Sequence, residues 1–233
     1  MPSSGTHAHP GLFLVLDGPD GGGKSTQAAR LADWLCSLCR DVVTCRDPGG
    51  TALGERLRAI LLERAAISIS LRSEMLLYMA SRAQLVEEVI APALAAGGVV
   101  ISDRYLLANI VYQGSAGGLL EEEIALVGMV ATGGLLPDLT IVLDIAPDTA
   151  SARVGPARDR IEDRPLFYRE RVRAGYLAAA RGESDPGATP GEPMGCPYYP
   201  APIVLIDASN DPDTVFREIK REVERVLAIR PRP

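Results

Sequence analysis

The eight residues from Gly18 to Ser25, Gly-Pro-Asp-Gly-Gly-Gly-Lys-Ser, have the spacing of a loop that binds the phosphates of a nucleotide. Glycines let the backbone turn back on itself, so that several N–H groups can point at one anion. Lys24 can reach the outer phosphates, and Ser25 can hold the magnesium ion that bridges them. An apolar run precedes the loop and a helical pattern follows it, which places the positive end of a helix at the same spot. This order favours a functional loop over a chance match to the motif.

Charged residues also follow two other apolar runs. Arg46 ends the run 42–46, and Asp103 and Arg104 follow the run that starts at Val99. Ligands of parallel sheets lie at the carboxyl ends of the strands. We therefore expect Asp103 to be the acidic partner of the magnesium ion and Arg104 to bind a second phosphate. The alternatives are a local ion pair of Asp103 with Arg104 and an ordinary turn after Arg46.

Glu74, Tyr78 and Arg82 are spaced so that they share one face of a predicted helix. An aromatic ring beside an arginine suits a planar base, because the ring can stack and the guanidinium can donate to base oxygens. A core face capped by Tyr78, with a surface salt bridge, explains the spacing equally well. Amide groups and a phenol recur at helical spacing shortly after Arg104, at Asn109, Tyr112 and Gln113.

Arginines are concentrated after the fourth apolar run, at Arg153, Arg158, Arg160 and Arg164. Gly155-Pro156 would interrupt a helix there. Phosphoryl transfer spreads negative charge over the transferring group, and one well-placed arginine can raise the rate by about 10³–10⁵. Most charge-rich segments are solvated loops. The phosphate loop has no arginine of its own, however, which supports an arginine-bearing flap over the nucleotide.

The elements that must position these residues alternate along the chain. Five apolar runs read as buried parallel strands, at about 12–17, 42–46, 99–103, 139–144 and 203–207. Helical patterns lie near 24–40, 52–64, 71–96, 120–133, 166–181 and 212–228. Thr51 can cap the second of these helices. The alternation predicts an α/β fold with a parallel sheet covered on both faces. The Gly- and Pro-rich stretch 182–202 is expected to be a surface excursion.

Composition limits the classes of function. The chain has 233 residues and a net charge of −6, so it lacks the general basic field of a nucleic-acid-binding protein. No apolar run reaches the roughly 18 residues of a membrane span. Residues 1–10 lack the pattern of a signal peptide and are expected to form a disordered tail. Cys36 and Cys39 have a C-x-x-C spacing, but no second pair accompanies them for zinc, and the helical pattern predicts buried, inert thiols. Such thiols fit a reducing cytoplasm.

Taken together, the motifs resemble those of the thymidylate kinase family over nearly the whole chain, from about Leu12 to Val226. The matching motifs, in order, are Asp20 to Thr26, Pro48-Gly49-Gly50-Thr51, Tyr78-Met79-Ala80-Ser81-Arg82, Asp103-Arg104-Tyr105 through Tyr112-Gln113, and Asp159-Arg160-Ile161-Glu162. The resemblance implies a three-layer P-loop NTPase fold formed by a single domain, 11–230. It also implies an arginine-rich lid at about 150–165, whereas the stretch at about 182–202 is longer than the family pattern and is interpreted as an inserted loop. The arginine-free loop with an arginine-rich lid resembles the bacterial subtype.

The resemblance also implies a role for each matching residue. ATP would be bound by Gly18, Pro19, Asp20, Gly21, Gly22, Gly23, Lys24, Ser25 and Thr26. The acceptor dTMP would be bound by Asp20, Arg46, Pro48, Tyr78, Arg82, Arg104, Asn109, Tyr112 and Gln113. Catalysis would depend on Lys24, Asp20, Arg104, Arg153, Arg158 and Arg160, and Mg²⁺ would be held at Ser25 and Asp103. Tyr78 would stack on thymine, and Tyr112 would crowd the sugar 2′ position and select deoxyribose.

The implied activity is the transfer of the γ-phosphoryl group of Mg–ATP to dTMP in a cytoplasmic homodimer. Two positions depart from the family pattern. Ala108 stands where many relatives have Ser, and Asp47 replaces the more usual Glu before Pro-Gly-Gly. Base specificity is the part of the assignment that these departures touch. Two rival hypotheses are a related kinase with another acceptor, such as dUMP or a nucleoside, and a nucleotide-binding regulatory protein that has lost transfer.

Overall fold

The computed structural model describes residues 9–63, 68–153, 160, 164–182 and 198–229. Five parallel strands form one sheet in the order β2-β3-β1-β4-β5. Their bounds are β1 Leu12–Asp17, β2 Val42–Arg46, β3 Val99–Asp103, β4 Leu139–Asp144 and β5 Ile203–Asp207. All five predicted strands are therefore confirmed, and so is the parallel sheet.

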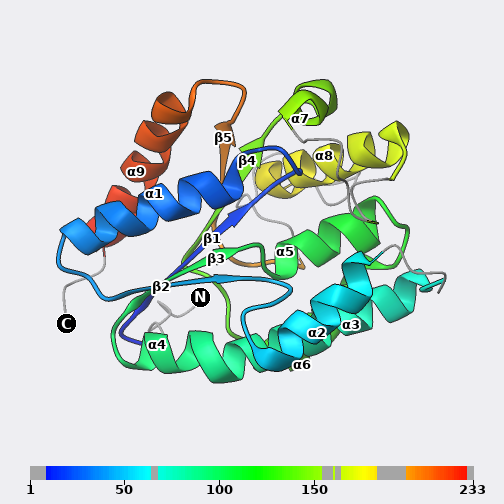
Figure 1. Ribbon diagram of the computed structural model, residues 1–233, viewed down its shortest axis with the longest axis horizontal. Helices are drawn as coiled ribbons and strands as arrows, with labels where there is room; N and C mark the ends of the chain where they lie inside the picture. Colours follow the sequence, from blue (N-terminus) through cyan, green and yellow to red (C-terminus); the bar gives the residue numbers. More distant parts are fainter. Residues whose placement is uncertain (1–8, 64–67, 154–159, 161–163, 183–197, 230–233) are drawn as a thin grey trace, which may run out of the picture.

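Helices cover both faces of this sheet, which gives the expected three layers (Figure 1). One face carries α1 (Lys24–Ser37) and α9 (Pro212–Ile229). The other carries α3 (Leu71–Leu85), α4 (Ala91–Ala95), α5 (Leu106–Asn109), α6 (Glu121–Thr132) and α8 (Leu166–Arg181). Two further helices, α2 (Ala52–Leu62) and α7 (Pro147–Arg153), each follow a strand.

The alternation of side chains in β1 explains both halves of the core. Leu14 and Leu16 pack on the face of α1 and α9, while Phe13 and Val15 pack on the opposite face, and all four are fully buried. The edge strands differ from the prediction, because most residues of β2 and β5 are only half-buried or exposed. An edge strand has a neighbour on one side alone, so an apolar run does not by itself establish complete burial.

The helices depart from the predicted pattern in two places. The region predicted as one helix over 71–96 is divided by a π-helical turn, η1 (Val86–Ile90). The segment after β3 forms α5 and a second π-helical turn, η2 (Ile110–Ser115), which the prediction did not include as an element. Most of its residues are buried, so it lacks the polar face that reveals an amphipathic helix. Thr51 caps α2 as expected, since its Oγ1 accepts from the Gly54 N–H at 2.9 Å.

Two predictions about burial were wrong. Cys36 and Cys39 are exposed free thiols, because the buried stripe of α1 ends at Leu35 and its last turn faces outward. The end of the predicted surface excursion enters the core, where Tyr199 is fully buried and its hydroxyl lies 2.7 Å from Thr140 Oγ1. Most of the tail 1–10, the lid 150–165 and the loop 182–202 lies outside the described residues. Within the described parts, no helix is long and apolar enough to cross a membrane.

Candidate active site

The phosphate loop connects β1 to α1, as the motif predicts. Gly18, Gly21 and Gly23 have positive φ angles, which L side chains rarely adopt. A Cβ at Gly18 would also lie 2.5 Å from the carbonyl oxygen of Leu143 in the neighbouring strand β4. Both observations explain why this turn requires glycine. The loop lines a cavity of about 370 Å³ at the carboxyl ends of the strands.

Lys24 lies at the start of α1 with its ammonium turned back into the loop. Its Nζ donates to the carbonyl oxygens of Gly18 at 3.1 Å and Pro19 at 2.9 Å, and lies 3.7 Å from Asp20 Oδ1. Only 7% of the residue is exposed, so the ammonium is poorly solvated. Burial, together with the charge of Arg104, lowers the pKa of Lys24. The loop thus holds a poorly hydrated cation where phosphate would bind.

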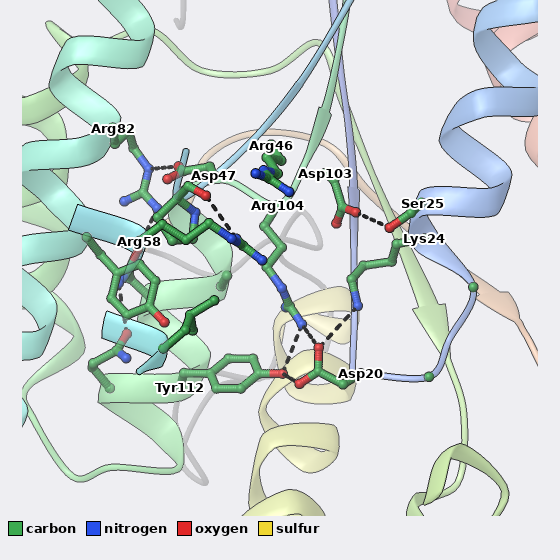
Figure 2. A pocket seen from close by; sticks show the side chains of 18 of the residues that line it. Asp20, Lys24, Ser25, Arg46, Asp47, Arg58, Arg82, Asp103, Arg104 and Tyr112 are labelled. Atoms are coloured by element: carbon green, nitrogen blue, oxygen red, sulfur yellow. Dashed lines mark hydrogen bonds and ion pairs between the residues drawn. The ribbon is translucent and has the colours of Figure 1, made fainter. Parts of the chain in front are cut away.

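Ser25 and Asp103 both line the pocket and are hydrogen-bonded to each other. The hydroxyl of Ser25 donates to Asp103 Oδ2 at 2.7 Å, although 78 residues separate them in sequence (Figure 2). Asp103 ends β3, which pairs with β1 and β2 and so brings their carboxyl ends together. A hydroxyl and a carboxylate are the oxygen ligands that Mg²⁺ prefers, so this pair fits the predicted ion.

Arg104 forms the centre of a charged cluster beside the phosphate loop. Its guanidinium donates to the Asp20 carboxylate and, at 3.2 Å, to the hydroxyl of Tyr112, which itself lies 3.1 Å from Asp20 Oδ2 (Figure 2). The backbone of Arg104 is left-handed, with a φ of 71°, a conformation that concentrates at functional sites. The phosphate-loop motif and the motif from Asp103 to Gln113 therefore meet at one point, as predicted.

The charge of Asp20 is set by this cluster. Burial would raise the pKa of its carboxyl, but Arg104 and Lys24 outweigh that effect and lower the pKa to about 2. Asp20 is consequently a carboxylate throughout the physiological pH range. It can orient neighbouring cations and hydroxyls, but it is too weak a base to remove a proton from a substrate.

Asp17 and Tyr176 also contact the guanidinium of Arg104, and sequence reasoning did not identify either residue. Arg104 Nη1 lies 3.3 Å from Asp17 Oδ1 and 3.1 Å from the hydroxyl of Tyr176, which donates to Asp17 Oδ1 at 2.6 Å. Burial raises the pKa of the fully buried Asp17, while Arg104 opposes the change. Asp17 carried the same signal as Asp103, an acid at the end of an apolar strand. Tyr176 carried no such sequence signal, because it lies on α8, 159 residues from Asp17.

The opposite wall of the pocket contains Tyr78, Arg82 and Asn109. Arg82 is buried, with its Nε 2.5 Å from Asp47 Oδ2 and its Nη2 2.6 Å from Asn109 Oδ1. The ion pair is therefore internal, and the alternative of a surface salt bridge is wrong. Asp47, read only as a departure from the family pattern, holds Arg82 in place. Tyr78 is half-buried and lines the pocket, as a stacking ring must.

A third wall comes from β2 and α2. Arg46 and Pro48 line the pocket as predicted, and Arg46 forms a 2.7 Å ion pair with Glu55. Arg58 and Leu62 of α2 line it as well, and Arg58 Nη1 donates to the carbonyl oxygen of Pro48 at 2.9 Å. Neither was singled out from sequence, where they are one arginine and one leucine on an ordinary helix.

The arginines expected in a lid lie elsewhere or outside the described residues. Arg153 donates to the carbonyl oxygens of Ala208 at 2.8 Å and Ser209 at 3.2 Å, beside the end of β5. Arg160 donates to Glu74 Oε2 at 2.7 Å and does not line the pocket. Arg158 is not among the described residues. The structure therefore brings together the predicted phosphate, metal and acceptor residues in one pocket, which Arg153 and Arg160 do not line.

Known proteins are similar to this chain in both sequence and fold. A family model described as Thymidylate kinase matches residues 16–185. The thymidylate kinase of Leifsonia xyli subsp. xyli is 44% identical over 214 residues, covering 91% of this chain and 93% of that protein. The thymidylate kinase of Symbiobacterium thermophilum is 41% identical over 217 residues, covering 93% of this chain and 94% of that protein.

A solved structure gives the same result. The crystal structure of the thymidylate kinase from Ehrlichia chaffeensis superposes with a TM-score of 0.69. The match has 25% sequence identity and covers 91% of this chain and 98% of that one. The two proteins therefore share the fold of a five-stranded parallel sheet with helices around it.

Proposed function

Because this chain belongs to the thymidylate kinase family, it is an ATP-dependent phosphotransferase that converts dTMP to dTDP in dTTP synthesis, and we propose that its pocket is the transfer site. One observation carries the proposal. Lys24 and the Ser25–Asp103 pair line the same cavity as Arg104, Tyr112 and Arg82. A donor phosphate and an acceptor nucleotide can thus be held side by side.

We propose that the loop from Gly18 to Thr26 holds the phosphates of ATP and that Ser25 and Asp103 hold Mg²⁺. The bound ion would neutralise charge on the donor phosphates. Lys24 would donate to the outer phosphate as it leaves the carbonyl oxygens of Gly18 and Pro19. Arg46 and Arg104 would bind the acceptor phosphate.

The acceptor needs no general base. The attacking oxygen belongs to a phosphate monoester, whose second pKa is about 6, so it is already ionised near neutral pH. Asp20, with its pKa of about 2, fits a positioning role toward the acceptor sugar or a metal-bound water and not that of a base. Catalysis then consists of alignment and charge neutralisation. The proposed contributions of Arg153, Arg158 and Arg160 stay predictions.

Tyr112→Phe is expected to weaken the selection of deoxyribose. The hydroxyl lies between Arg104 and Asp20, at 3.2 and 3.1 Å, where it would crowd a sugar 2′-hydroxyl. Its removal should reduce the kcat/KM ratio of dTMP to the ribonucleotide of thymine about tenfold, the effect of roughly 1.4 kcal/mol. Steady-state kinetics with both acceptors would measure the ratio. An unchanged ratio would rule out the sugar-selecting role.

A homodimer is the second part of the proposal, and an exposed apolar surface supports it. Leu76 of α3 and Leu126, Met129 and Val130 of α6 are 41–85% exposed, and these two helices pack against each other. A second copy of the chain would bury this surface. A cytoplasmic location also stays a prediction.

Val130→Asp is expected to convert the dimer to a monomer, because it places a charge at the most exposed residue of this apolar surface, which the second copy would bury. Size-exclusion chromatography with light scattering measures the mass directly. Ile229→Asp is the matched control, since Ile229 is 80% exposed at the end of α9, away from α3 and α6. Equal masses for wild type and Val130→Asp would contradict the proposed interface.

An assay of ADP release tests the proposed activity. The full chain, Mg–ATP and a panel of acceptors that includes dTMP, dUMP, dCMP and thymidine would be compared by kcat/KM. A selective signal with dTMP supports both the chemistry and the acceptor. Selectivity for dUMP or a nucleoside would favour the rival kinase, and ATP binding without ADP release would favour the regulatory protein.

A further inference from the structure

Glu74 has a carboxylate that the proposed chemistry does not use, although the residue is only 1% exposed. It does not line the pocket. Its Oε1 accepts from Gln113 Nε2 at 2.8 Å, its Oε2 accepts from Arg160 Nη2 at 2.7 Å, and both oxygens accept from Arg164 Nη2 at 2.9 Å. A buried carboxylate is costly unless it is paired, so this site depends on its three partners.

A continuous chain of hydrogen bonds leads from Glu74 back to the pocket wall. Gln113 Oε1 accepts from Asn109 Nδ2 at 2.8 Å, and Asn109 Oδ1 accepts from Arg82 Nη2 at 2.6 Å. Arg82, Asn109 and Gln113 are each at most 2% exposed, and all three border the pocket. At the other end of this series of hydrogen bonds, Arg82 forms an ion pair with the carboxylate of Asp47.

The charges at the two ends fix the direction of every bond between them. Arg82 can only donate, so Asn109 must present its oxygen to Arg82 and its NH₂ group to Gln113. Gln113 must then accept through its oxygen and turn its own NH₂ group toward Glu74, which can only accept. Reversal of either amide would set donor against donor or acceptor against acceptor. Arg82 sets this orientation from one end of the chain, and the Glu74 carboxylate enforces it from the other end.

This orientation decides what the pocket offers to an acceptor base. Thymine presents a carbonyl acceptor at C4 and an N–H donor at N3, where cytosine presents an amino donor and a bare ring nitrogen that only accepts. A wall in which Arg82 donates and the Asn109 oxygen accepts suits the first pattern and opposes the second. We propose that Glu74 is a positioning residue whose buried carboxylate fixes the Asn109 and Gln113 amides for base discrimination and ties them to Arg160 and Arg164. The inference rests on the proposed function.

Glu74→Gln tests the proposal, because it keeps the shape of the side chain and removes its charge. A neutral amide can donate or accept, so the Gln113 and Asn109 amides are then held in this direction from the Arg82 end alone. We expect the kcat/KM ratio of dTMP to dCMP to fall at least about tenfold. The kcat with dTMP should also fall, since Arg160 and Arg164 lose their anchor. Glu88→Gln, the same change at an exposed glutamate, should alter neither quantity.

A second variant keeps the proposal testable if Glu74→Gln does not fold. Gln113→Met interrupts the chain between Glu74 and Asn109 but leaves both arginines bound to Glu74. It should reduce the dTMP-to-dCMP ratio with a smaller effect on kcat than Glu74→Gln. An unchanged ratio in a folded variant, as judged by thermal unfolding, would overturn the inference. Failure of the proposed function is distinguishable, because the wild type itself would then not phosphorylate dTMP.

Discussion

Lys24→Ala is expected to lower kcat by at least about 10²–10³, the usual effect of removing one preorganised donor to a developing anion. Lys24 is the one lysine of the phosphate loop, and its ammonium is poorly hydrated before any ligand binds. A donor that is already desolvated and aimed at the site needs little reorganisation when charge develops on the transferring group. No neighbouring arginine in the loop can substitute for it, because the loop contains none.

Folding should survive this substitution. The variant removes a buried cation, which relieves a desolvation cost, and leaves the carbonyl oxygens of Gly18 and Pro19 without that donor. These effects oppose each other, so the midpoint of thermal unfolding should change little. Lys220→Ala, at a half-exposed lysine of α9, is the matched control for both measurements. Full turnover by Lys24→Ala would remove the phosphate loop from the mechanism.

Arg104→Lys is expected to lower kcat/KM for dTMP by about 10²–10³ while the protein stays folded. Lysine keeps the charge but loses the planar fork, which here contacts Asp17, Asp20, Tyr112 and Tyr176 at once. The acceptor phosphate would then be held by one point charge in place of a bidentate donor. Arg225→Lys, at an exposed arginine of α9, is the matched control for the kinetics. Unaltered kcat/KM would contradict the proposed role of Arg104.

Arg104→Ala should also destabilise the fold, by up to about 3–5 kcal/mol, because it leaves Asp17 buried without its cation. The loss should depend on pH. Burial raises the pKa of Asp17 and Arg104 opposes this, so the pKa should rise further in the variant. A carboxyl whose folded-state pKa exceeds its unfolded-state pKa destabilises the fold as pH rises through the interval between these two pKa values. The stability deficit relative to wild type should therefore shrink as pH falls toward 5, and a constant deficit would exclude Asp17 as its source.

Much of the site could be predicted because its residues lie at the ends of strongly patterned elements. Each of the five apolar runs is a strand, and parallel strands bring their carboxyl ends to one edge of the sheet. Asp103, Arg104 and Arg46 could be placed there from spacing alone. The loop motif has its own geometry, which explains why Lys24 and Ser25 were identified with their surroundings.

The remaining residues of the site depend on tertiary contacts that spacing does not specify. Tyr176 reaches Asp17 from α8 only because α8 crosses behind the phosphate loop. Glu74 shares a helical face with Tyr78 and Arg82, yet its partners Gln113 and Arg160 come from distant segments. Local periodicity gives the face of a helix but not what lies opposite, and for the same reason the exposure of Cys36 and Cys39 was missed.

The most direct test follows the transferred group itself. The full chain would be mixed with Mg²⁺, dTMP and ATP that carries radioactive phosphorus at the γ position, and the nucleotides would be separated after short times. We predict that the label appears in the β-phosphate of dTDP at the rate of ADP formation, and that Lys24→Ala removes this signal. Label found only in inorganic phosphate, or remaining in ATP while dTMP is present in excess, would contradict the assignment of this pocket to dTMP phosphorylation.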